Sequence, residues 1–321
     1  MIWLLACASS GDSGAADDSA ARQRRVDTHA HFASGDVSAA AEALDLGAQG
    51  WDAALFMPTP QVPDQDHTTT AQQLHAAGVE RVVAGGGTLN VQIQAAVAGA
   101  PIDEGEFAAT AESLLNQGAL GFGELAAEHV VIGGTEPYVS APPDHPLFLR
   151  LAEVAASRGV PIDLHMEAVT ADRDTPDWLR ENSANPETLS ENVSGLEALL
   201  EHAEADIVWA HGGWDPLGER TPELTEQLLS RHDNLYISLK ATGEGTLSTL
   251  VVDGALDPDW LGVIERYPER FLLGSDHFHL APGQSRSLPQ GGAYTADLVE
   301  LLPPDLRGAV AWDNAARLYG L

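Results

Sequence analysis

The sequence predicts an α/β fold, a (β/α)8 barrel of the TIM type, from three observations. The chain has 321 residues, and a barrel of this kind typically needs about 250. Eight short apolar runs alternate with stretches of helical spacing, and this alternation implies a parallel sheet. Polar residues suited to chemistry stand at the ends of the apolar runs, where barrel enzymes carry their active sites. Eight repeated units favour a closed barrel over an open sheet.

The predicted strands are short apolar segments, and amphipathic segments lie between several of them. The strands are expected at residues 25–31, 53–57, 81–84, 119–124, 161–165, 206–211, 235–240 and 271–276. Helices are expected at residues 106–117, 146–157, 196–203, 222–231 and 259–267. In the second of these helices, Leu147, Leu151 and Val154 recur at helical spacing, and Gly159 follows as a stop. A glycine triplet at 85–87 lacks the later residues of a phosphate loop and predicts a turn with close backbone approach.

Residues 1–24 are predicted to lie outside the barrel, which is assigned to residues 25–321. Leu4-Leu5-Ala6-Cys7 resembles a bacterial lipobox, and residues 8–21 have the Ser, Gly, Asp and Ala content of a disordered, flexible tether. We therefore expect a lipoprotein in the bacterial cell envelope, with membrane contact only through a lipid on Cys7. Only six residues precede Cys7 and none is positively charged, so a full signal peptide is missing. A chance cysteine in a cytoplasmic protein is the alternative.

The charge balance excludes nucleic acid as an expected partner. Asp and Glu total 48 against 16 Lys and Arg, which gives a formal net charge of −32. Such a surface repels phosphate backbones, whose binding depends on Lys and Arg. The single cysteine also excludes a disulfide within the chain and a cysteine-based metal site. The expected partner is a small-molecule substrate, and the oligomeric state is left open.

A metal centre is predicted from the polar residues at the strand ends. His29 and His31 are two positions apart on a strand, so their side chains project to the same face. Other strand ends contribute two further histidines and two carboxylates. Imidazole and carboxylate ligands suit Zn²⁺ best, with Mn²⁺, Fe²⁺ or Ni²⁺ as alternatives. The predicted ligands are His29, His31, Glu124, His165, His211 and Asp276.

Six motifs between residues 25 and 320 resemble the amidohydrolase superfamily. The resemblance is closest to metal-dependent hydrolases of the amidohydrolase-2 type. It is carried by Val26-Asp27-Thr28-His29-Ala30-His31, Gly123-Glu124, Ile162-Asp163-Leu164-His165-Met166-Glu167, Trp209-Ala210-His211-Gly212-Gly213, Leu273-Gly274-Ser275-Asp276 and Asn314-Ala315-Ala316-Arg317-Leu318-Tyr319-Gly320. The combination is specific for the superfamily and says little about the substrate.

This resemblance implies how the ligands are shared. His29, His31 and Asp276 would hold the more buried metal. His165 and His211 would hold a second metal, or in a mononuclear member one would bind the metal and the other would touch the substrate. Glu124 stands at the fourth strand, where binuclear relatives place a bridging carboxylated lysine or glutamate. A glutamate there resembles the TatD-type branch and favours two metals.

The expected activity is hydrolysis of a small-molecule ester, lactone or amide by a metal-activated water. Asp276 would take a proton from that water and pass it to the leaving group. His211 and Lys240 complete the predicted catalytic set. Lys240, the only lysine in the chain, ends the seventh strand and would bind a substrate carboxylate or oxyanion. A lysine exposed at a strand end is the competing interpretation.

Three alternatives to hydrolysis stay open. The first is nonoxidative decarboxylation of an aromatic or unsaturated acid, which would use one metal and set His211 and Asp276 on the substrate. Glu124 argues against it. The second is a TatD-like nuclease, which the acidic surface disfavours. The third is a tethered lipoprotein that only binds a metal or ligand.

Several further residues are predicted near the pocket. Glu167, Trp214, His277 and His279 follow ligand positions and would line it, with a purely structural loop role as an equal alternative for Glu167 and His279. His67 is expected to be solvated. The long segment 168–192 is expected to form a lid or specificity element. Within it, Arg173 and Arg180 are expected to pair with neighbouring acids rather than with an anionic substrate.

Overall fold

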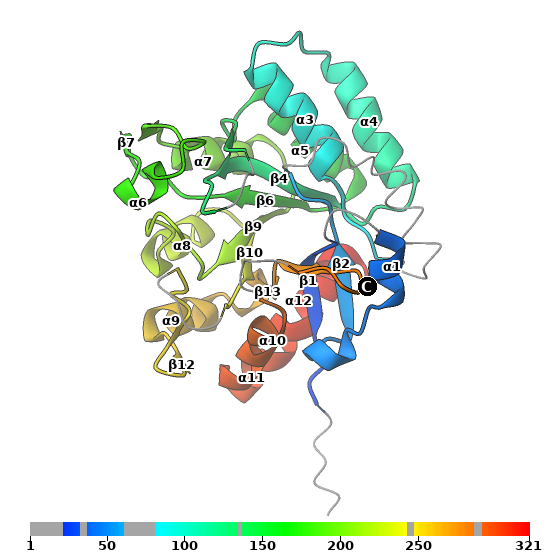
Figure 1. Cartoon of the computed structure of the whole chain (residues 1–321), viewed down its shortest axis with the longest axis vertical. Helices are drawn as coiled ribbons and strands as arrows, with labels where there is room; N and C mark the ends of the chain where they lie inside the picture. The colour runs from blue at the N-terminus through cyan, green and yellow to red at the C-terminus, as the bar shows by residue number, and fades with distance from the viewer. Residues whose placement is uncertain (1–21, 33–36, 61–80, 134–136, 243–246, 286–290) are drawn as a thin grey trace, which may run out of the picture.

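The strands of the computed structural model follow the predicted order. It describes residues 22–32, 37–60, 81–133, 137–242, 247–285 and 291–321, and all eight predicted strands form within them. Figure 1 shows the helices arranged round the outside of these strands. The barrel strands are β1 (Val26–Phe32), β2 (Ala53–Phe56), β3 (Ala84–Gly85), β4 (Phe122–His129), β6 (Ile162–Met166), β9 (Ile207–Gly212), β10 (Leu235–Leu239) and β13 (Phe271–Leu273).

The strands close into a barrel, which confirms the predicted fold. A parallel series runs β13-β10-β9-β6-β4-β3, and β1 pairs in parallel with β2 on one side and with β14 (His277–His279) on the other. A parallel bridge from Phe56 to Val82 joins β2 to the segment that leads into β3. The backbone N–H of Asp276 donates to the carbonyl of His29 at 2.8 Å, which ties the end of the eighth strand to the first.

The helices begin and end where local chemistry favours it. Asp103 accepts a hydrogen bond from the N–H of Glu106 at the start of α4, and Asp257 accepts from Asp259 and Trp260 at the start of α9. The main helices are α3 (Gly86–Val97), α4 (Glu104–Asn116), α5 (Pro146–Arg158), α7 (Val193–His202), α8 (Pro222–Leu229), α9 (Pro258–Arg266) and α10 (Gly292–Leu301). Shorter helical segments are α1 (Val37–Glu42), η1 (Gly47–Gln49), α6 (Asp177–Arg180), η2 (Pro268–Arg270), α11 (Pro304–Gly308), η3 (Ala309–Asp313) and α12 (Asn314–Tyr319). The five predicted helices correspond to α4, α5, α7, α8 and α9.

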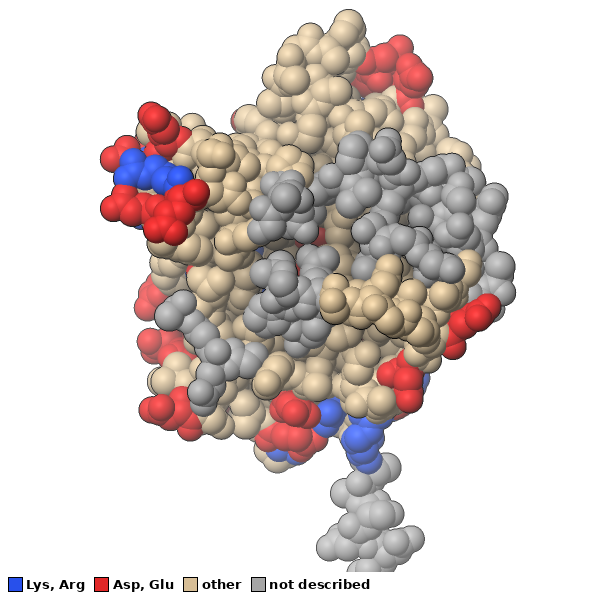
Figure 2. Space-filling model, viewed as in Figure 1, with Lys and Arg blue, Asp and Glu red and all other residues tan. Residues whose placement is uncertain are grey.

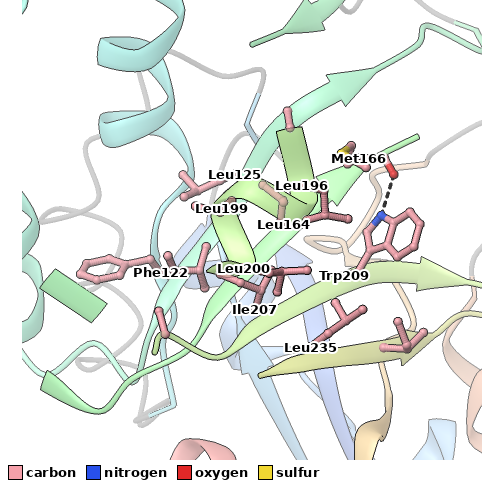
Figure 3. Packing of buried hydrophobic residues seen from close by; sticks show 14 of the residues in the cluster. Phe122, Leu125, Leu164, Met166, Leu196, Leu199, Leu200, Ile207, Trp209 and Leu235 are labelled. Atoms are coloured by element: carbon pink, nitrogen blue, oxygen red, sulfur yellow. Dashed lines mark hydrogen bonds between the residues drawn. The ribbon is translucent and has the colours of Figure 1, made fainter. Parts of the chain in front are cut away.

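The main core lies between the strands and the surrounding helices. Figure 3 shows Leu196, Leu199 and Leu200 of α7 packed against apolar residues of the neighbouring strands. The buried Trp209 on β9 belongs to this layer, and its indole N–H donates to the carbonyl of Met166 at 2.8 Å. The hydrogen bond pins β6 to β9, which end in two of the predicted metal ligands.

A second apolar cluster fills the barrel at the opposite end from the predicted ligands. It joins strand residues such as Val26, Leu55 and Leu272 to Leu318 and Tyr319 of α12. A filled interior is typical of this fold, in which the chemistry is left to the carboxyl ends of the strands. The arrangement therefore confines the site to the other end.

The predicted close approach at the glycine triplet is present. Gly85 has a φ of +116°, and a Cβ on Gly86 would lie 2.5 Å from the carbonyl oxygen of Pro58 and 2.7 Å from that of Glu124. A larger residue at position 86 would displace the backbone that carries Glu124.

The end of the fourth strand differs from expectation. Glu124 does not end the fourth strand, because β4 continues to His129 and pairs there with β5 (Val139–Ser140) in antiparallel fashion. The β4–β6 register shifts between Phe122 and Leu125, at the position of Glu124.

The segment 168–192 carries its own short elements, namely α6 and the antiparallel pair β7 (Arg173–Asp174) and β8 (Thr188–Leu189). Side-chain hydrogen bonds fix it to the barrel, as where Asn185 bonds the N–H and the carbonyl of Val131. These bonds hold the segment against the barrel, and we call residues 168–192 the wall. A further antiparallel pair, β11 (Val251–Val252) and β12 (Ala255–Leu256), precedes α9.

Some predictions fall outside the described residues. These are the lipid anchor at Cys7, the tether over residues 8–21 and the solvated His67. Within the described ranges, every helix is too short or too polar to cross a bilayer.

Candidate metal centre

The structure brings the six predicted ligands into one buried cluster. His29 and His31 on β1 are fully buried, and His165 and His211 come from β6 and β9. Two sets of donor atoms lie within metal-binding distance of one another: one from His29, His31 and Asp276, the other from His29, Glu124 and His211.

The first half of the centre is formed by His29, His31 and Asp276. The Nε2 atoms of His29 and His31 lie 3.1 Å apart, and Nε2 of His31 lies 3.2 Å from Oδ1 of Asp276. Oε2 of Glu124 faces the same two nitrogens, at 3.6 Å from His29 and 3.4 Å from His31. Two imidazoles and two carboxylate oxygens thus converge on one point.

The second half is formed by His165 and His211. Nδ1 of His165 and Nε2 of His211 lie 3.0 Å apart. The other oxygen of Glu124, Oε1, lies 2.7 Å from His165 Nδ1 and 3.4 Å from His211 Nε2. Glu124 therefore turns one oxygen to each half.

Hydrogen bonds behind the rings test whether the cluster suits a cation. Nδ1 of His29 faces the carboxylate of Asp163 at 3.1–3.2 Å, and Nδ1 of His31 faces the carbonyl of Met57 at 2.8 Å. Both partners only accept, so each Nδ1 donates, and the neutral form of each ring, the form that binds a metal, turns the lone pair of Nε2 toward the cluster. Nε2 of His165 donates to Glu167 in the same way, at 2.9 Å. The converging lone pairs fit divalent metal ions.

The carboxylates make the cluster strongly attractive to positive charge. Burial lowers the pKa of His29, but Asp163 and Glu124 outweigh it and hold that pKa well above the usual range. Against the same effect of burial, Glu167 and Glu124 raise the pKa of His165 to about 9. For Glu124, the surrounding histidines outweigh burial and hold the pKa well below the usual range. The electron pairs that attract protons here are the ones that a metal would use.

Backbone conformation marks two of the ligands. Among the described residues, three that are not glycine have positive φ, and two of these are His211 (66°) and Asp276 (52°). His211 is the penultimate residue of β9, and Asp276 lies three residues after the end of β13. Left-handed backbone at such residues costs about 1–3 kcal/mol and is concentrated at functional sites.

Lys240 lies beside the first half and directly contacts a predicted ligand. Its Nζ is 2.6 Å from Oδ2 of Asp276 and 3.8 Å from the centre of the Trp214 ring. It is 6% exposed, so it is buried rather than a surface lysine. Burial would raise the pKa of Asp276, but the charge of Lys240 holds it well below the usual range.

The other predicted pocket residues divide into two groups. Glu167 is buried against His165, and Trp214 packs against Lys240 and edge-on to His211. His279 packs instead against the aromatic rings of Phe32 and Phe56. Burial, followed by the charges of His277 and His31, lowers the pKa of His279 to about 3, so it stays neutral.

The two arginines of segment 168–192 pair with acids, as predicted. Arg173 pairs with Glu219, and Arg180 pairs with Asp177. Figure 2 shows the basic atoms on this face adjoining acidic ones.

Sequence reasoning missed Asp163 and Phe278. Asp163 lies two positions before His165, and a buried charged residue inside an apolar strand was a usable signal. Phe278 lies between two histidines and places its ring 4.6 Å from that of His31. No signal in the sequence distinguished its orientation from that of its neighbours.

A protein-family model described as "Amidohydrolase" matches residues 12–321, nearly the whole chain. This chain belongs to the amidohydrolase family. The match confirms the predicted family resemblance. Members of this family are metal-dependent enzymes. No curated protein matches this amidohydrolase in sequence.

Solved structures similar to this amidohydrolase support the barrel fold. A dihydroxybenzoic acid decarboxylase from Polaromonas sp. JS666, with bound manganese and the inhibitor 2-nitroresorcinol, has 13% identity and a TM-score of 0.51 over 93% of this chain and 97% of its own. A D-hydantoinase has 13% identity and a TM-score of 0.52 over 92% and 70%. An apo structure from Agrobacterium tumefaciens has 16% identity and a TM-score of 0.50 over 93% and 96%.

Proposed function

We propose that this amidohydrolase cleaves a small-molecule ester, lactone or amide by hydrolysis at a two-metal centre. The observation that carries the proposal is the orientation of Glu124, whose two oxygens face separate pairs of imidazole nitrogens. A carboxylate placed in this way suits a bridge between two ions. His29, His31 and Asp276 would hold one ion, and His165 and His211 the other.

Zn²⁺ suits these ligands best, and Mn²⁺ is the first alternative. When bound, such ions lower the pKa of water and polarise a substrate oxygen. The protein's own contribution is to fix the donor atoms. Asp163, Met57 and Glu167 lock three of the four rings in the orientation that turns a lone pair inward.

Asp276 is the proposed proton acceptor for the attacking water. Lys240 contacts its Oδ2, while Oδ1 faces the cluster near His31. From this position Oδ1 would take a proton at the cluster and give it to the leaving group. His211 lies on the opposite side of Glu124, where it would contact the bound substrate or the second ion.

Decarboxylation and nucleic-acid cleavage are less well supported. In a decarboxylase with a single metal, Oε1 of Glu124, which faces His165 and His211, would bind no metal. A nuclease needs basic side chains along the backbone of its substrate. The face shown in Figure 2 has predominantly acidic charge.

The test combines metal analysis with a substrate screen on one preparation. Elemental analysis of the purified protein is expected to give two divalent ions per chain. The same sample is expected to hydrolyse a member of an ester, lactone, amide and phosphotriester panel. His165→Ala is expected to lose both the second ion and the hydrolysis. His202→Ala, which alters an exposed histidine on α7, is the matched control. One metal per chain together with carbon dioxide release from a test acid would overturn the proposal.

A further inference from the structure

Lys240 combines features that a purely structural ion pair does not need. It is the only lysine in the chain, and the other 15 of the 16 basic residues are arginines. It follows β10 directly, at the barrel end that carries the metal ligands. Replacing a buried ion pair by apolar residues is often neutral or stabilising, so stability alone gives little reason to keep this one.

The ammonium group of Lys240 has unused capacity for hydrogen bonding. It carries three N–H donors. One points to Oδ2 of Asp276, and the face of Trp214 covers another side of the group. Among the described residues, the Asp276 carboxylate and the Trp214 ring are the two groups that contact Nζ of Lys240. A donor is therefore left for a bound molecule.

The neighbouring arginines cannot supply this charge. Arg220 is buried and donates to the carbonyls of Ala210 and Trp214, so its guanidinium is committed to the backbone. Arg173 and Arg180 are paired with Glu219 and Asp177 on the outer wall. Among the described residues around the cluster, Lys240 is the cation that adjoins a predicted ligand.

We propose that Lys240 selects substrates that carry a carboxylate separate from the bond that is cleaved. The inference rests on the proposed function and adds the substrate class to it. In the free protein Asp276 occupies one N–H donor of Lys240. The substrate carboxylate binds a remaining donor, and the ring of Trp214 lies alongside as an apolar wall.

The physical basis is the balance of charge at the site. The protein as a whole repels anions, since its formal net charge is −32. A carboxylate-bearing substrate therefore needs a local cation that is held in place before binding. Trp214 and Asp276 supply that positioning, and hydrogen bonds to a charged group are the strong kind.

Binding of two matched probes to the protein with its own metal tests this inference without any turnover. Phenylacetate and phenylacetamide have similar shapes and differ in charge. By isothermal titration calorimetry, the unaltered protein is expected to bind phenylacetate about tenfold or more tightly than phenylacetamide. Lys240→Met is expected to abolish this preference, and Lys240→Arg to keep most of it. Circular dichroism and metal content establish that each variant is folded and loaded.

Two outcomes would overturn the proposal. Equal binding of the two probes by the unaltered protein, or no binding of phenylacetate, removes the basis for anion selection and needs no variant. A preference that persists in Lys240→Met, or in Lys240→Gln if the first variant does not fold, assigns the preference to the metal ions instead. Hydrolysis of neutral lactones by a two-metal protein that binds both probes equally would keep the proposed function and reject this inference.

Discussion

The two halves of the proposed metal centre differ in the hydrogen bonds that orient their histidines. In the first half, both rings have an acceptor behind them, at Asp163 for His29 and at Met57 for His31. In the second half, Glu167 orients His165, whereas Nδ1 of the buried His211 has no hydrogen-bond partner within the described residues. Hydrogen bonds behind a ligand fix its orientation and raise its affinity for metal. We therefore expect the first half to bind its ion more tightly.

The largest effect is expected from removing what the two halves share. Glu124→Gln removes the charged oxygen that Glu124 contributes to each half, so metal content should fall from two ions to at most one. The loss of activity should exceed the about 10- to 100-fold that outer-shell partners contribute. Elemental analysis and initial rates measure both. Glu153→Gln on the exposed face of α5 is the matched control, and retention of two ions in Glu124→Gln would contradict the bridging role.

Two variants should weaken the halves separately. Asp163→Asn reverses the hydrogen bond to His29 and should lower the affinity of the first half by about 10- to 100-fold. Glu167→Gln should do the same for the second half and spare the first. Chelator competition followed by metal analysis resolves the two ions. Asp233→Asn, at a fully exposed site, is the control. Identical losses in both variants would mean that the halves are not independent.

A smaller effect concerns stability beside the second half. Glu128 is buried and bonded to Tyr138 and Ser140, and burial raises its pKa to about 7. Because the folded pKa exceeds the unfolded value of about 4.3, its contribution is complete below that value and is lost as the pH rises through 7. Glu128→Gln should therefore remove a decline of about 2–3 kcal/mol in unfolding free energy between pH 5 and 8. Denaturant titrations at several pH values measure it, and an unchanged decline would assign it to other groups.

The smallest effect is expected at the wall formed by residues 168–192. Arg173→Gln removes a partly exposed ion pair with Glu219, which should change stability by less than about 1 kcal/mol. Metal content should stay the same. A large fall in activity would show instead that Arg173 reaches the substrate.

Sequence alone predicted the strands and placed the six candidate ligands near their ends because both depend on local pattern. In any barrel, an apolar run that ends in a polar residue predicts a strand with a candidate site residue at its carboxyl end. The orienting residues were harder to find, since Asp163 acquires its meaning only from His29, 134 positions away.

The spacing of two histidines along a strand does not predict which way they face. His29 and His31 share a face of β1, and His277 and His279 have the same spacing. The first pair faces the cluster, whereas Phe278 contacts His31 and His279 packs against Phe32 and Phe56. Spacing establishes that two side chains share a face of a strand. It does not establish which face lies inward.

The pairing of β1 with β14 has a consequence for how the protein is made. His29 leaves the ribosome early, but Asp276 is synthesised 247 residues later, and β14 follows it. Glu124, His165 and His211 are all available before that moment. The ligands of the first half therefore come together only when the last barrel strand has been added, whereas all residues of the second half have been synthesised by position 211.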